Sequence, residues 1–96
     1  MHRALLERRI RDVHARLVRA REDLAVLDEQ LAVVMESADE ARVRSLIAET
    51  PLAAHEHSEA ARHADAMAKA REALAGTVTD LEHRQDELLA DVAGGS

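Results

Sequence analysis

The residues best suited to chemistry are histidines and glutamates gathered within residues 55–63, which hold three of the six histidines. Glu59 and His63 are four residues apart and Glu56 and His63 are seven apart, so a helix would place all three on one side. Such groups can bind Zn²⁺, and a two-fold dimer could supply further ligands. The Glu-x-x-His pairs of di-iron bundles are absent, however, and Glu59 with His63 also makes an ordinary surface pair. Glu56, Glu59 and His63 are therefore weak metal candidates.

The sequence lacks the residues that nucleophilic catalysis needs. Ser37, Ser45 and Ser58 have no matching His–carboxylate arrangement, cysteine is absent, and no Gly-rich loop could hold a phosphate. Long helices of this composition also offer no concave pocket for a small substrate. We therefore expect no enzymatic activity and no cofactor.

Basic residues are concentrated at the N-terminal end. Residues 1–21 contain seven arginines against two acidic residues, and the rest of the chain contains six basic and seventeen acidic residues. This segment could bind nucleic acid or an anionic membrane. The arginines are scattered around the helix, however, aromatic residues are absent, and the net charge is −6. We favour pairing of the arginines with the acidic C-terminal segment of a folded-back chain.

A heptad pattern defines the element that carries these arginines. Apolar residues alternate spacings of three and four at Ile10, Val13, Leu17, Ala20, Leu24, Leu27, Leu31 and Val34. This repeat predicts a coiled-coil helix over about residues 3–36, with alternate members at heptad positions a and d.

The pattern changes after residue 36. Ser37 and Glu40 have the spacing of a capping box, and Val43, Leu46 and Ile47 do not continue the a/d series. We expect a short helix over about residues 38–49. A single helix running to residue 49 is the alternative, because no Gly or Pro forces a break.

A second long helix is predicted over about residues 51–92. Thr50 is suited to an N-cap and Pro51 to the first helical position. The seam of this helix contains two polar residues at position a, Arg71 and Gln85, which would fix the register. Arg71 could also reach Asp28 on the first helix. Gly76 lies inside the helix and could mark a close approach by another backbone.

The two long helices should fold back on each other as an antiparallel hairpin. One register pairs every large residue at position a of the first helix with a large residue at position d of the second. An alternative register, one heptad shorter, leaves Leu31 opposite Ala60. The favoured register joins Ile10 to Leu88, Leu17 to Leu81, Leu24 to Leu74 and Leu31 to Met67. The fold is then a single all-α domain of residues 1–93 with a flexible tail at 94–96.

Apolar residues outside the seam indicate self-association. A two-helix hairpin has one seam, so further apolar stripes would remain in water unless another chain covers them. Small residues at seven-residue spacing let helices approach closely, and two hairpins can form a four-helix bundle. We predict a homodimer whose interface contains Val26, Val33, Ala54, Ala61, Ala68 and Ala75.

The expected bend is acidic, with Asp39 and Glu40 at its tip. A helical hairpin with an acidic tip resembles the coiled-coil arm of the Gre-type transcript-cleavage factors, which enter a channel of bacterial RNA polymerase. The resemblance covers only that arm, and no functional residue is carried over from it. It implies a regulator that inserts the acidic tip into RNA polymerase.

Three functions remain open at this stage. The first is a non-enzymatic coiled-coil interaction or scaffolding protein, a homodimer with a possible protein partner. The alternatives are the polymerase regulator and a nucleic-acid binder that uses the arginine-rich segment. No apolar run approaches the ~18 residues of a membrane span, so we expect a cytoplasmic protein without a membrane partner. The excess of Arg over Lys is typical of GC-rich bacteria.

Overall fold

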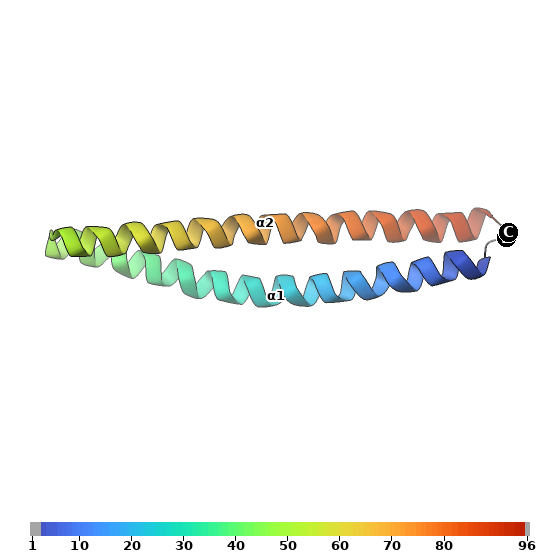
Figure 1. Ribbon diagram of the computed structural model, residues 1–96, viewed down its shortest axis with the longest axis horizontal. Helices are drawn as coiled ribbons and strands as arrows, with labels where there is room; N and C mark the ends of the chain where they lie inside the picture. The colour runs from blue at the N-terminus through green and yellow to red at the C-terminus, as the bar shows by residue number, and fades with distance from the viewer. Residues whose placement is uncertain (1–2, 96) are drawn as a thin grey trace. The chain divides into compact units, whose positions relative to one another are not determined.

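The computed structural model describes residues 3–95, which form two α-helices and no strand. Helix α1 spans Arg3–Ala48 and helix α2 spans Pro51–Gly94. The predicted all-α helical hairpin is confirmed (Figure 1). Residues 1, 2 and 96 of the expected domain and tail lie outside the described residues. Neither helix contains, within residues 3–95, a stretch apolar enough to cross a lipid bilayer.

The helices are divided between two compact units. Unit 1 consists of Met1–Leu24 and Ala73–Ser96, and unit 2 consists of Ala25–Glu72, which includes the turn. In each unit a segment of α1 packs against a segment of α2.

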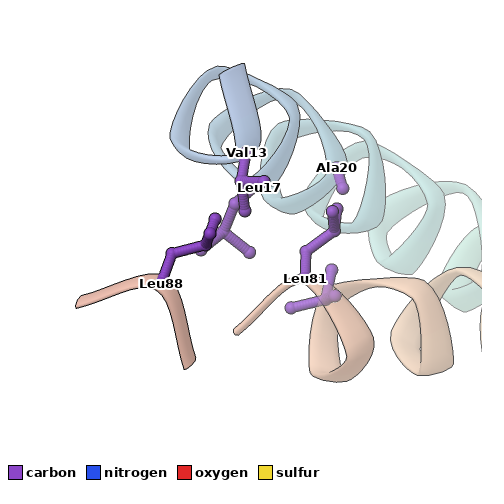
Figure 2. Close-up of a cluster of buried hydrophobic side chains, with 6 residues drawn as sticks. Val13, Leu17, Ala20, Leu81 and Leu88 are labelled. Atoms are coloured by element: carbon purple, nitrogen blue, oxygen red, sulfur yellow. The ribbon is translucent and has the colours of Figure 1, made fainter. Parts of the chain in front are cut away.

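Unit 1 contains the larger hydrophobic core. Leu17 and Leu88 are almost completely buried, and Figure 2 shows Leu81 and Leu88 of α2 directed toward α1. All members of this core lie at the predicted a and d positions. The buried cluster contains Val13, Leu17, Ala20, Val78, Leu81 and Leu88, with Leu6, Ile10, Leu24 and Leu74 packed against it.

Unit 2 fixes the register of the hairpin. The Arg71 Nε donates a hydrogen bond to an Asp28 carboxylate oxygen at 2.6 Å, as the favoured register allows. In the shorter register Arg71 would lie level with Ala20, which is roughly 12 Å from Asp28 along α1 at 1.5 Å per residue. The contact therefore excludes the shorter register.

The predicted break at residue 37 is wrong, because α1 continues without interruption to Ala48. Its a/d series also continues, through the half-buried Ala38, the buried Ala41 and the half-buried Ser45. These side chains are small, so the seam persists without the large residues that made it visible earlier in the chain. Ser37 and Glu40 have the spacing of a capping box but do not start a helix. The backbone N–H groups at these positions are already hydrogen-bonded within the continuous α1.

The turn follows the prediction at Thr50-Pro51. Pro51 is the first residue of α2, and the Thr50 hydroxyl accepts a hydrogen bond from the Ala53 N–H at 3.1 Å. Glu49 closes α1 in a left-handed conformation, with φ of 52°, and its N–H donates to the Ser45 carbonyl at 3.1 Å. A non-glycine residue in this conformation is strained, because its Cβ crowds the backbone.

Substitutions at the turn should have opposite effects on stability. Glu49→Gly removes the Cβ strain and should raise the free energy of unfolding by about 1 kcal/mol. Thr50→Ala removes the cap of α2 and should lower it by about 1 kcal/mol. Urea denaturation followed by circular dichroism measures both effects. A Glu49→Gly chain less stable than the parent would contradict the observed turn.

The two adjacent leucines near the end of α2 provide a matched test of the core. Leu88 is 1% exposed and Leu89 is 47% exposed. Leu88→Ala should lower the free energy of unfolding by ~2–5 kcal/mol, because it leaves a cavity in the seam. Leu89→Ala should change it by less than about 1 kcal/mol. Equal losses in denaturant titrations would show that the seam does not run as described.

Candidate interaction surfaces

The weak metal candidates do not form a metal site. Glu56, Glu59 and His63 are all exposed. The carboxylate of Glu59 forms an ion pair with the guanidinium of Arg62 at 3.0 Å. Within residues 3–95, no group of three or more His, Asp or Glu side chains is placed to hold a metal ion.

The acidic tip is also misplaced by the sequence prediction. Because α1 continues to Ala48, Asp39 and Glu40 lie within the helix, about 13 Å before its end at 1.5 Å per residue. Both are exposed, and Asp39 lies 3.7 Å from Arg42 on the same helix. Glu49 is the acidic residue at the turn itself.

The turn carries an apolar surface that the sequence analysis did not recognise. Leu46 is 66% exposed, Ile47 is 79% exposed, and Leu52 on the other side of the turn is 68% exposed. For Leu46 and Ile47, departure from the a/d series was the available signal. We interpreted that departure as a break in the helix, whereas it marks side chains that point away from the seam.

The predicted interface residues lie on two different sides of the hairpin. Ala54, Ala61, Ala68 and Ala75 each follow a d residue of α2, whereas Val26 and Val33 each precede a d residue of α1. In an antiparallel pair, these positions flank the seam on opposite sides. We name them the alanine side and the valine side.

Surface grooves in unit 2 agree with this division. On the alanine side, Ala61 shares a groove with Met35, Asp39 and Asp65. On the valine side, Val33 shares a groove with Gln30, Val34 and Met67. The alanine-side groove also contains Arg42, and Glu29 lines the valine-side groove beside its aliphatic residues.

Two polar residues interrupt the seam of α2, as predicted. Arg71 is bound to Asp28, and this hydrogen bond raises the pKa of Arg71 above its ordinary value. Gln85 lies in unit 1, where its Oε1 atom is buried without a hydrogen-bond partner. A buried acceptor without a donor lowers the stability of the folded state.

The arginine-rich segment forms one ion pair with the acidic end of α2 among the described residues. Arg21 donates to the Glu82 carboxylate at 2.9 Å, while Arg3 pairs with Glu7 on its own helix. Both pairs are exposed, where ion pairs contribute little to stability. The expected pairing of the two segments is thus present at Arg21.

Gly76 has no close neighbour within the chain. A Cβ atom built at this position would meet no atom within 4 Å. The hairpin itself therefore does not require glycine here, and the expected close approach does not occur within one copy.

Comparisons with family models, curated proteins and solved structures find no match for this chain.

Replacing the unsatisfied glutamine should stabilise unit 1. Gln85→Leu removes the buried acceptor and adds apolar area to the seam, so the free energy of unfolding should rise by about 1–2 kcal/mol. His83→Leu, on the exposed side of the same turn, should change it by less than about 0.5 kcal/mol. Thermal and urea unfolding compare the two variants. Destabilisation by Gln85→Leu would indicate that the side chain has a partner.

Proposed function

We propose that this protein is a non-enzymatic coiled-coil interaction protein that acts through self-association and protein partners. The observation that supports the proposal is the large aliphatic surface outside the seam. Large apolar residues between 38% and 79% exposed occur along both helices: Leu5, Val18, Val26, Val33, Met35, Val43, Leu46, Ile47, Leu52 and Leu89. Exposed apolar surface on this scale is typical of an interaction surface.

The size of the core supports the same conclusion. Among residues 3–95, eight apolar residues are buried, and three of them, Ala20, Ala41 and Ala53, are alanines. Small side chains bury little area, and no aromatic residue compensates for them. A single two-helix seam of this kind gives marginal stability, and packing against another chain increases the buried area.

The other two functions gain no support from a particular observation. A polymerase regulator was inferred from an acidic tip, whereas Leu46, Ile47 and Leu52 are exposed at the turn. A nucleic-acid binder needs a continuous basic surface. The arginines of α1 remain distributed around the helix, and Arg21 is already paired with Glu82.

Self-association can be tested by light scattering over a concentration series, with helicity recorded by circular dichroism. We expect the mass to approach twice that of the chain at micromolar concentration, and unfolding to depend on concentration. A monomer that unfolds cooperatively at every concentration would contradict the proposal, because the hairpin would then be complete by itself.

A further inference from the structure

Two stripes of opposite charge run along the outer faces of unit 2. On α1, Glu29 and Glu36 are seven residues apart and lie on the face opposite the seam. On α2, Arg62 and Lys69 have the same spacing and the same position relative to their own seam. All four residues are exposed.

Each charged stripe lies beside uncharged residues with matching spacing. Val33, 63% exposed, lies between Glu29 and Glu36 on the adjoining edge of α1. Ala66, which is also exposed, lies between Arg62 and Lys69 on the corresponding edge of α2. One helix therefore presents a protruding side chain flanked by acids, and the other presents a small residue flanked by bases.

The residues of the two stripes also lie at the same heights along the helix axes, which we call levels. The contact between Arg71 and Asp28 sets the levels within unit 2. By the same register, Glu36 lies level with Arg62, Glu29 with Lys69, and Val33 with Ala66.

The matched charges cannot meet within one chain, because the outer faces point away from each other across the seam. Among the described residues, Glu29, Glu36 and Lys69 take part in no recorded ion pair, and Arg62 is paired with Glu59, its neighbour on α2. The acidic stripe of α1 and the basic stripe of α2 therefore do not pair with each other inside the hairpin.

We propose that the valine side of unit 2 is the surface on which a second copy of this chain docks. A two-fold axis that runs along unit 2 brings α1 of one copy beside α2 of the other, in opposite directions and at the same levels. Glu36 then pairs with Arg62 of the partner subunit, Glu29 pairs with Lys69 of the partner subunit, and Val33 packs over Ala66 of the partner subunit. Symmetry repeats each contact, and the result is a four-helix bundle. This inference rests on the proposed self-association and gives it a location.

Exposed aliphatic side chains, rather than charge, distinguish the valine side. Val26 is 53% exposed, and Val33, at the same heptad position, is 63% exposed. Val33 also shares a groove with Val34 and Met67. Carboxylates occur on both sides: Glu40 and Glu59 have the heptad position of Val33 and Ala66 on the valine side, and Asp39 and Asp65 line a groove with Arg42 on the alanine side. The valine side is therefore assigned by the apolar area that a second copy would cover.

Charge reversal tests this surface. One variant carries Glu29→Lys and Glu36→Lys, and the other carries Arg62→Glu and Lys69→Glu. In a homodimer of either variant, like charges face each other at every contact, so we expect the dissociation constant to rise at least about tenfold. In an equimolar mixture every contact again joins opposite charges. We expect the mixture to form a heterodimer, detected by light scattering and by native mass spectrometry.

A matched control reverses two carboxylates on the other side. Asp39→Lys with Asp65→Lys changes the charge by the same amount as the double glutamate variant, and it should leave the dissociation constant within about threefold of the parent. Circular dichroism of every variant confirms that the helices remain folded.

The possible outcomes separate this inference from the proposed function. A parent chain that stays monomeric overturns both. A dimeric parent whose charge-reversed variants dimerise equally well overturns only the valine side as the docking surface. Weakening by each reversal, with recovery in the mixture, supports the two-fold bundle.

Discussion

The seam between α1 and α2 is the interaction on which the rest of the structure depends. Its buried members are aliphatic, and near the turn they become alanines such as Ala41 and Ala53. Small side chains bring the helices close but bury little apolar area. The hairpin is consequently well specified in register while its outer faces keep valines, leucines and an isoleucine in water. The proposed self-association follows from that imbalance.

Much of this fold could be predicted from the sequence, because a heptad repeat encodes both the helix and the face that it buries. The register could also be predicted, because it places the leucines of α1 opposite those of α2 and brings Arg71 within reach of Asp28. The continuation of α1 past residue 37 was not accessible in the same way. In a sequence, an alanine or serine in the seam cannot be told from an alanine or serine on the surface. Leu46 and Ile47, which are exposed, have the residue types expected of a hydrophobic core.

The wrongly predicted break at residue 37 also led to a wrong position for the acidic tip. A break at residue 37 would place Asp39 and Glu40 at a bend, but a helix that continues to Ala48 carries them away from the turn. The predicted interface residues are exposed or half-exposed apolar positions, but their positions in the sequence do not state on which side of the seam each one falls. Placing Val33 beside Met67, and Ala61 beside Met35, required the paired helices.

The most direct test of the account uses the absence of native cysteine. Chains with Val33→Cys and chains with Ala66→Cys are mixed and treated with a short bifunctional thiol reagent, and mass spectrometry identifies the linked pairs. Docking through the valine side predicts that most linked pairs join one chain of each type. A mixture of Val33→Cys with Ala61→Cys chains should link poorly, because Ala61 lies on the alanine side. Equal or better linkage to position 61 would contradict the account.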